Sequence, residues 1–348
     1  MAVINQKGGC GKTTTAISLA GYFAAASWRT LLVDLDPQGH CAAGLAIPEQ
    51  RLELTIAEGL LAAGAGEPLP DPARLLWRVS RDLDLAPSTM RLAALESARG
   101  GLAGLPEPEK ALRRLLKQLE DRYHACIVDC SPSIGLLAYN ALAAADLVLI
   151  PVETGFFALQ GAGKQVQTVA ALGRRLGAEA PCLLLPTMHD PASMLAQDLL
   201  AELTRRFPGK VAPRLVRYDP ALREAASFGQ PVGEYAPESP GAQDYRALAA
   251  WLLARLSGQP HVEVPEAADV PPEPVTCAEA SPDAQAPRAA VPTPLISDQG
   301  SSQDMPAPEP ALTVTLSRAA DLAARAKRLQ AGPPVPAVPV PVQIGSEP

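Results

Sequence analysis

The feature that most constrains the fold of this chain is a glycine-rich loop between a short apolar run and a helical stretch. Residues 2–5 suit a buried strand, residues 8–13 read G-G-C-G-K-T, and residues 14–26 suit a helix. Glycines let backbone N–H groups turn toward an anion, and the helix N-terminus adds its positive dipole end. Lys12 can neutralise phosphate charge, and the Thr13 hydroxyl can bind Mg²⁺. The sequence therefore predicts a phosphate-binding loop between a strand and a helix.

Apolar strand-like runs alternate with helical stretches before residue 257. Strands are expected at 2–5, 30–34, 82–86, 125–129, 147–151 and 182–186. Helices are expected at 14–26, 109–122, 136–145, 159–176 and 192–207. Continuous apolar strands that alternate with helices predict an α/β fold, a mostly parallel sheet with helices on both faces. Ligands of such sheets bind beyond the carboxyl ends of the strands.

The composition changes sharply after Ser257. Of the 37 prolines, 18 follow this residue, and residues 257–348 hold 11 acidic against 5 basic side chains. Subtracting these from the totals of 37 and 30 leaves 26 acids and 25 bases in residues 1–256, so the acidity belongs to the tail. A proline-rich chain buries too little apolar surface to offset its ordering entropy. We therefore expect one folded domain at 1–256 and a largely disordered tail at 257–348.

One stretch of the tail could be helical. Residues 317–330 contain neither proline nor glycine, and Leu322, Ala326 and Leu329 recur at helical spacing among four basic side chains. The stretch is either a marginal helix in a linker or a short docking helix for a partner or an anionic surface. The pattern favours the first interpretation.

Several classes of protein are disfavoured. No run of about 18 apolar residues is present, so no transmembrane helix is expected. The N-terminus lacks a charged region followed by an apolar one, so we expect no signal peptide. The cysteines follow no zinc-like or disulfide-like spacing, which suits buried thiols in a reducing cytoplasm. They are Cys10, Cys41, Cys126, Cys130, Cys182 and Cys277.

Carboxylates follow two further strands. Asp34 and Asp36 end the apolar run at 30–34 and are spaced to share a side if the strand continues. A carboxylate near the terminal phosphate of a nucleotide can order the attacking water or hold the metal shell. Asp129 ends the run at 125–129 in the Walker-B arrangement, in which the carboxylate holds Mg²⁺ directly or through water.

A second lysine distinguishes the phosphate loop. Residues 7–14 read K-G-G-C-G-K-T-T, and Gln6 stands where the ordinary loop has its first glycine. This pattern resembles the deviant Walker-A loop of the ParA/MinD ATPases. The resemblance implies that Lys7 reaches across a dimer interface to the partner subunit's nucleotide, so that ATP is sandwiched between two copies of the chain.

The resemblance extends over residues 1–256. Residues 34–39 are similar to the family's switch I and lean toward the ParA branch through their D-P-Q-G ending, which implies a hydrolytic role for Asp36 and a supporting one for Asp34. Residues 129–135 are similar to switch II, except that Ser131 replaces the usual first proline.

The resemblance implies ATP and Mg²⁺ as cofactors and assigns roles to individual residues. The catalytic residues would be Lys7, Lys12 and Asp36. Nucleotide phosphates would bind Gly8, Gly9, Cys10, Gly11, Lys12, Thr13 and Thr14. Mg²⁺ would bind Thr13 and Asp129.

Basic side chains cluster within residues 205–223. They could contact DNA phosphates, and Arg214, Arg217 and Arg223 are the candidates, although the family's two arginines align with Tyr218 and Ala221. The alternative is a solvated surface.

The preferred hypothesis for function is an ATP-dependent dimerising ATPase that partitions a chromosome or plasmid, or positions cargo, on the nucleoid with a ParB-like stimulating partner. One alternative is a MinD-like membrane-cycling ATPase, which the thin apolar face of residues 317–330 disfavours. Another is a switch protein with slow hydrolysis, in which ATP mainly controls partner choice.

Overall fold

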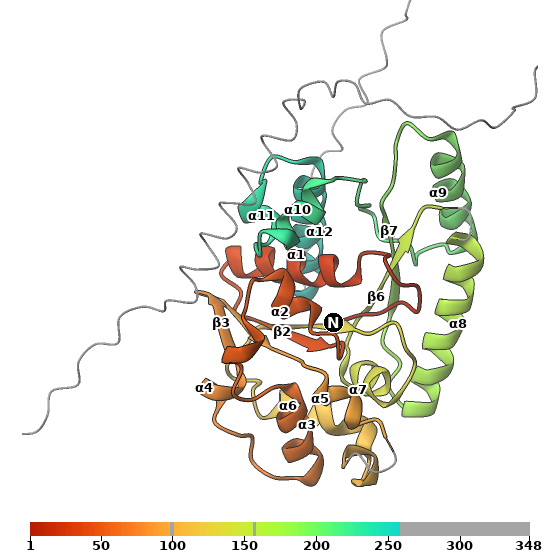
Figure 1. The fold of residues 1–348 in the computed structure, drawn as a ribbon. Helices are drawn as coiled ribbons and strands as arrows, with labels where there is room; N and C mark the ends of the chain where they lie inside the picture. The colour runs from red at the N-terminus through yellow and green to blue at the C-terminus, as the bar shows by residue number, and fades with distance from the viewer. Residues whose placement is uncertain (98–100, 156–157, 258–348) are drawn as a thin grey trace, which may run out of the picture. The chain divides into compact units, whose positions relative to one another are not determined.

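The computed structural model describes residues 1–97, 101–155 and 158–257, and in them seven strands form one sheet. The strand order is β3-β4-β2-β5-β1-β6-β7 (Figure 1). The strands are β1 (Ala2–Val3), β2 (Thr30–Leu35), β3 (Trp77–Ser80), β4 (Leu83–Ala86), β5 (Ala125–Cys130), β6 (Val148–Glu153) and β7 (Cys182–Thr187). Neighbouring strands are parallel except for the antiparallel pair β3–β4. The expected mostly parallel sheet is confirmed.

Helices cover both faces of the sheet (Figure 1). They are α1 (Lys12–Ala25), α2 (His40–Gly44), α3 (Ile56–Ala65), α4 (Pro72–Leu75), α5 (Arg91–Ala94), α6 (Ala111–Lys117), α7 (Leu136–Ala144), α8 (Ala158–Leu176), α9 (Met194–Arg206), α10 (Ala221–Ser227), α11 (Val232–Tyr235) and α12 (Pro240–Leu256).

The two faces of the sheet belong to two separate cores. In β2, Leu31 and Val33 join a cluster with side chains of α3, α6, α7 and α8. Leu32, between them, joins a second cluster with α1 and α12. Successive side chains of a strand point to opposite faces, so a strand covered on both sides must be apolar throughout. This is why the buried strands were recognisable as continuous apolar runs.

The first and last helices of the described chain pack against each other. The Thr15 hydroxyl on α1 shares a hydrogen bond with the Tyr245 hydroxyl on α12 at 2.8 Å, and Tyr245 is only 1% exposed. The Tyr22 hydroxyl, also on α1, donates to the Ala242 carbonyl at 2.8 Å. A buried hydroxyl costs free energy unless it is hydrogen-bonded, so these pairs fix α12 against the helix that starts at the phosphate loop.

Some elements differ from the expectation. The helix expected at 109–122 is a short 3-10 turn followed by α6, which ends at Lys117. At that end the Gln118 side chain accepts from the Leu69 amide at 3.0 Å and donates to the Glu67 carbonyl at 3.2 Å, which ties the chain to the loop after α3. Tertiary contacts therefore override local helix propensity at this point.

The proline-rich tail lies outside the described residues, as does the possible helix at 317–330. The boundary between the domain and the tail therefore stays a prediction. Among the described residues, no helix combines the length and the apolar character needed to cross a membrane.

Candidate functional site

The phosphate loop lies between β1 and α1, at the carboxyl end of β1. Gly9 and Gly11 have φ angles of 74° and 89°, a backbone region that side chains with a Cβ atom rarely adopt. The space beside Gly8, Gly9 and Gly11 is open, with no atom within 4 Å of the Cβ position that each one lacks. No side chain caps the start of α1, so its first amides face this open space. The loop therefore offers backbone donors to an anion, as expected.

Lys12 lies inside the loop and is buried, with 7% of its surface exposed. Its ammonium donates to the Lys7 carbonyl at 3.1 Å. The loop is also held from outside, because the Thr187 hydroxyl at the end of β7 donates to the Cys10 carbonyl at 3.0 Å. Thr187 was not among the expected site residues, and only its position at the end of a strand could have suggested it.

Thr13 and Asp129 form a direct pair across the site. The Thr13 hydroxyl donates to Asp129 Oδ2 at 2.6 Å, and Asp129 is fully buried at the end of β5. The other carboxylate oxygen, Oδ1, is buried without a hydrogen-bond partner. A buried carboxylate oxygen without a partner is costly, and a hard cation such as Mg²⁺ prefers oxygen ligands. Thr13 and Asp129 therefore fit the expected magnesium site.

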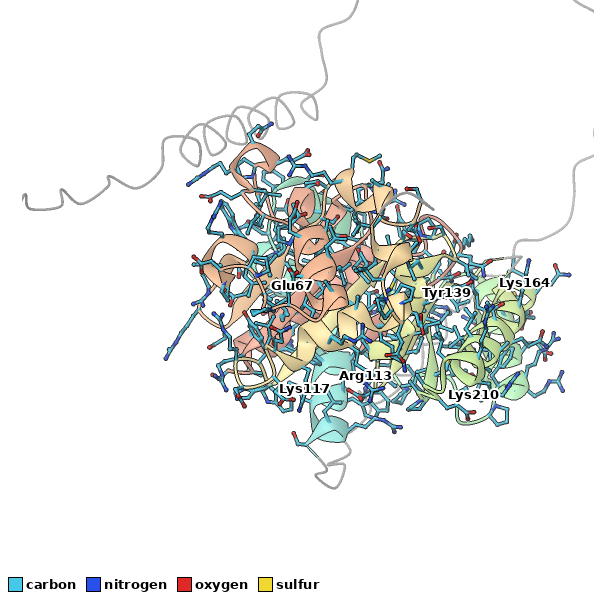
Figure 2. All side chains as sticks on the ribbon, turned by 90° about the horizontal axis from the view of Figure 1, so that it is seen from below. Glu67, Arg113, Lys117, Tyr139, Lys164 and Lys210 are labelled. Carbon is cyan, nitrogen blue, oxygen red and sulfur yellow. The ribbon has the colours of Figure 1, made fainter. Side chains whose placement is uncertain are left out.

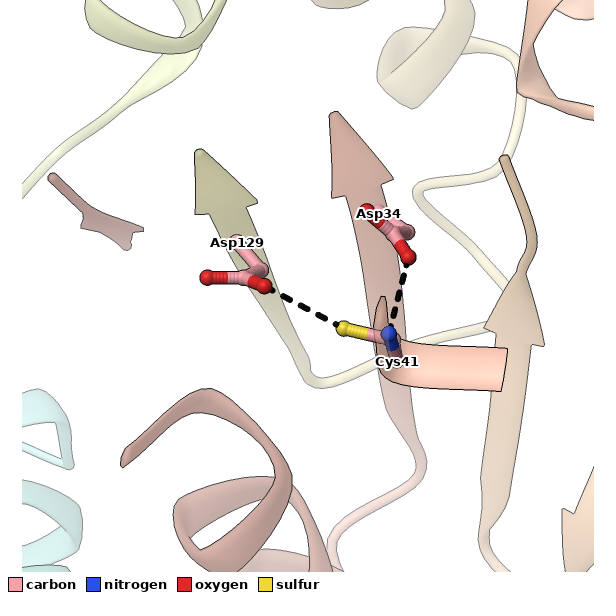
Figure 3. Close-up of side chains that lie close together, drawn as sticks. All are labelled: Asp34, Cys41 and Asp129. Atoms are coloured by element: carbon pink, nitrogen blue, oxygen red, sulfur yellow. Dashed lines mark hydrogen bonds between the residues drawn. The ribbon is translucent and has the colours of Figure 1, made fainter. Parts of the chain in front are cut away.

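Asp34 and Asp129 are aligned on neighbouring strands, opposite each other in the β2–β5 register. Both carboxylates are buried, and Figure 3 shows them on the two strands. Burial, with the neighbouring Asp129 carboxylate, raises the pKa of Asp34 to about 7. Burial also raises the pKa of Asp129. Two like charges in a low-dielectric interior oppose each other's ionisation, so the pair holds a proton more readily than two separate carboxylates would.

Asp34 and Asp36 have different surroundings. Asp34 accepts from the amides of Asp36 at 2.9 Å and Cys41 at 3.0 Å, so its carboxylate shapes the turn after β2. Asp36 instead lines the cavity beside the phosphate loop, and its Oδ2 lies 3.7 Å from His40 Nδ1. The geometry thus separates a carboxylate that shapes a turn from one that faces the cavity, and the supporting and hydrolytic roles inferred from the sequence stay predictions.

Cys41 is a site residue that the sequence did not reveal. Its thiol lies between the two buried carboxylates and donates to Asp129 Oδ2 at 3.5 Å (Figure 3). Burial raises the pKa of the Cys41 thiol well above its ordinary value, so the group is a neutral donor. The spacing of the cysteines in the sequence could not indicate this position, because the partners of Cys41 are carboxylates on two strands and not other cysteines.

Lys7 lies at the edge of the site. Its ammonium forms an ion pair with the Glu153 carboxylate at the end of β6, and the Lys7 side chain is 51% exposed. The structure thus separates the two lysines of the loop: Lys12 points inward and Lys7 faces solvent.

A cavity of about 700 Å³ extends from the phosphate loop to the segment after β7. Its walls include Gly9, Lys12, Thr13, Asp36, Met188, Val216, Tyr218, Leu222 and Tyr245. Pockets of about 300–1,000 Å³ hold small-molecule ligands and cofactors. A nucleotide fits these walls, because phosphate donors lie at one end and apolar side chains lie at the other.

The basic residues proposed for DNA contact divide into two groups. Arg217 and Arg223 line the cavity, and the Arg217 guanidinium is held by Asp244, with 2.7 Å between Nη2 and Oδ1. Arg223 lies over the Tyr218 ring at 5.9 Å. Arg214 is half-buried outside the cavity. In this conformation Arg217 therefore braces α12 and is not offered to a phosphate backbone.

Comparisons with known proteins place this geometry in a family. The family model described as "AAA domain" (AAA_31) matches residues 1–179. The chromosome partitioning protein ParA of Myxococcus xanthus is 38% identical over 256 residues, which are 73% of this chain and 88% of that protein. The chromosome-partitioning ATPase Soj of Thermus thermophilus is 38% identical over 257 residues, which are 74% of this chain and 96% of that protein.

A solved structure gives the same result for the fold. The crystal structure titled cobyrinic acid a,c-diamide synthase from Mycobacterium smegmatis, with bound ATP analogue and magnesium, is 30% identical to this chain. It aligns with a TM-score of 0.62 and covers 74% of this chain and 94% of that one. The phosphate loop, the paired carboxylates and these relatives all indicate the same family. The chain belongs to the ParA/Soj family of chromosome-partitioning ATPases.

Proposed function

We propose that this chain is an ATP-dependent, dimerising switch that partitions DNA or positions cargo on the nucleoid in the cytoplasm. The observation that carries the proposal is the arrangement of three groups around one cavity: the phosphate loop with Lys12, the Thr13–Asp129 pair, and Asp36. Nucleotide and Mg²⁺ are bound in the Mycobacterium smegmatis structure described above, which supports the same ligands here.

Each residue has a separate task in this proposal. The loop amides and Lys12 would hold the phosphates, and Thr13 and Asp129 would hold Mg²⁺. When bound, Mg²⁺ would supply positive charge beside the phosphates. Asp36, with its carboxylate in the cavity, would orient the attacking water by accepting a hydrogen bond from it. Hydrolysis would then require both Asp36 and an intact phosphate loop.

Lys7 supports a dimeric form. Its side chain is half-exposed and its carboxylate partner, Glu153, is 37% exposed, so the ion pair can exchange at low cost. We propose that Lys7 leaves Glu153 and reaches the nucleotide of a second copy of the chain. Two nucleotides would then lie between two copies of the chain, and hydrolysis would release the two copies from each other.

DNA would bind this dimer through exposed cations. Arg206, in the last turn of α9, and Lys210, which follows α9, are exposed. Figure 2 shows Lys210 and Lys164 on the same flank of the molecule. Neutralising phosphates with such side chains releases counterions, so binding would weaken steeply with salt. We propose that a ParB-like partner stimulates slow ATP turnover and so ends DNA binding.

The test is ATP-dependent binding of a random DNA duplex by the full chain, followed by fluorescence anisotropy over a range of salt concentrations. We expect binding with ATP and Mg²⁺, little binding with ADP, and loss of binding in the Lys7→Ala variant. Equal binding with either nucleotide would refute the nucleotide-gated mechanism. Co-sedimentation with anionic liposomes tests the MinD-like alternative, which no observation favours over partitioning.

A further inference from the structure

Residues 87–96, here named the bridging segment, follow β4 and contact both the loop that carries Asp36 and the segment that follows Asp129. One contact is with the loop after β2, residues 36–39. The other is with the segment after β5, residues 131–137. Neither contact was expected from the sequence, because the three segments are far apart along the chain.

The first contact joins Ser88 to the loop after β2. The Ser88 hydroxyl donates to the Asp36 carbonyl, and Ser88 is 2% exposed. The Ser88 carbonyl also lies 3.1 Å from the point where a Cβ atom of Gly39 would be. Gly39 has a φ of 65°, so a side chain there would be both strained and crowded. The bridging segment thus fixes the backbone of the residue whose carboxylate faces the cavity.

The second contact joins Glu96 to the start of α7. Glu96 Oε1 accepts from the Leu137 amide at 3.2 Å. Gly135, the residue before α7, offers no capping side chain, and a Cβ atom at Gly135 would collide with Glu96 Oε1. An acceptor at the first turn of a helix satisfies an amide that has no partner within the helix, and a negative charge there is attracted by the positive end of the helix dipole. Glu96 therefore caps α7 from a distant segment.

The bridging segment is itself well anchored. Leu92 and Leu95 are 0% and 5% exposed in the core below the sheet. The Pro87 carbonyl accepts from the Ile56 amide at the start of α3, at 2.8 Å. Close-packed interiors transmit displacements rather than absorb them. Ser88 and Glu96 are therefore joined by a segment that is anchored in the core between them, which is the geometry that coupling of the two loops would require.

We propose that Glu96 is a positioning residue for ATP hydrolysis, and that through the bridging segment it keeps the segment after β5 in register with Asp36. This inference rests on the proposed function, since it concerns the same hydrolytic step. Glu96 would touch neither nucleotide nor water. It would determine the position of residues 131–135 relative to Asp36. Loss of Glu96 would therefore lower kcat more than it changes the KM for ATP.

The test compares Glu96→Ala with Glu96→Gln in the full chain. Gln keeps an oxygen acceptor for the Leu137 amide, whereas Ala removes it. We expect Glu96→Ala to lower kcat about tenfold with KM for ATP within about twofold, and Glu96→Gln to stay within about threefold of the unmodified chain. The matched control is Ser97→Ala, the next residue along the chain, because the Ser97 hydroxyl donates to the nearby Ala94 carbonyl. A Glu96→Ala variant with unchanged kcat would overturn the proposal.

A second measurement does not depend on ATP turnover. Amide hydrogen exchange of nucleotide-free protein should rise at residues 131–138 in Glu96→Ala and return toward the original level in Glu96→Gln. Coupling is tested by adding Ser88→Ala. If one support serves both loops, the double variant should lose less kcat than the product of the two single losses. Independent losses would contradict the coupling. A chain that shows the exchange pattern but hydrolyses no ATP would instead refute the proposed function and leave the Glu96 contact standing.

Discussion

The Lys7 ammonium and the Glu153 carboxylate form an ion pair at the rim of the cavity, between the phosphate loop and the end of β6. The lysine proposed to reach a second copy of the chain is thus held by its own copy. In the proposed dimer this pair would have to break before Lys7 could contact the partner's nucleotide. Glu153 would therefore oppose dimer formation by a small amount.

Glu153→Gln should consequently favour the ATP-bound dimer. Exposed ion pairs contribute up to about 1 kcal/mol each, and a symmetric dimer would break two, one in each copy, so we expect the dimer dissociation constant to fall by up to about 30-fold. Sedimentation velocity with ATP and Mg²⁺ measures this dissociation constant. The control is Glu202→Gln, which removes another exposed pair, with Arg205 on α9. A weaker dimer in Glu153→Gln would mean that Glu153 contributes to the interface.

Asp36→Ala should separate nucleotide binding from hydrolysis. The carboxylate lines the cavity, whereas the phosphate donors lie on the loop, so ATP affinity should change little. Loss of a group that positions water or accepts a proton should reduce turnover at least about hundredfold. Phosphate release and light scattering should then show a persistent ATP-bound dimer. Turnover close to that of the exposed-site control Glu49→Ala would remove Asp36 from the chemistry.

Thr13→Val and Thr13→Ser test the pair with Asp129. Ser retains the hydroxyl that donates to Asp129 Oδ2, and Val replaces it with a methyl group of similar size. We expect Val to weaken Mg²⁺-dependent nucleotide binding about 10- to 100-fold, and Ser to change it far less. Titration with a fluorescent ATP analogue at several Mg²⁺ concentrations gives the comparison. Equal losses in both variants would indicate a packing role for the Thr13 methyl group.

The Asp34–Asp129 pair predicts an unusual dependence of stability on pH. The pKa of Asp34 is raised to about 7 in the folded chain, so between about pH 4 and 7 the folded state holds a proton that the unfolded state has released. This stabilisation is present at low pH and is lost as the pH rises toward 7. The melting temperature of nucleotide-free protein should therefore fall from pH 5 to pH 8.

Asp34→Asn should reduce that fall, because the amide carries no charge at either pH. A change of 1 kcal/mol in the free energy of unfolding shifts the melting temperature by about 2–4 °C for a domain of this size. Asp121→Asn, at an exposed turn, is the control and should keep the slope of the unmodified chain. If Asp34→Asn leaves the slope of melting temperature against pH unchanged, the group responsible for the pH dependence is not Asp34.

Exposed cations beyond α9 should determine the salt dependence of DNA binding. Removing Arg206 and Lys210 together should weaken ATP-dependent binding to every sequence alike and reduce the slope of log affinity against log salt by about one for each lost phosphate contact. Lys117→Ala serves as the control, since Lys117 lies on a different flank in Figure 2. An unchanged slope would place the DNA surface on other elements.

The sequence was sufficient to predict elements that depend mainly on residues close together in the chain. Buried parallel strands appear as continuous apolar runs, and the phosphate loop is recognisable because glycines, a lysine and a threonine must follow one another there. Strand β3 was missed because Trp77–Ser80 is a short, half-exposed edge strand without such a run. Helix α12 was also missed, although Ser239 accepts from the Ala242 amide at its start.

Contacts between distant segments were beyond sequence reasoning. Cys41 lies against Asp129 only because β2 and β5 are neighbours, and that order depends on the packing of the whole sheet. Arg217 was chosen for its charge alone, but its guanidinium is held by Asp244 on α12. A side chain's charge can be predicted from its residue type, whereas its partner depends on the tertiary fold.

The hydrogen bond between Thr15 and Tyr245 has a consequence for synthesis of the protein. The phosphate loop is synthesised well before α12, so α1, the helix that follows the loop, lacks one of its packing partners until α12 has been made. A nascent chain that ends before α12 would therefore expose the apolar side of α1 and hold nucleotide poorly. Completion of the last described helix thus coincides with completion of the nucleotide site.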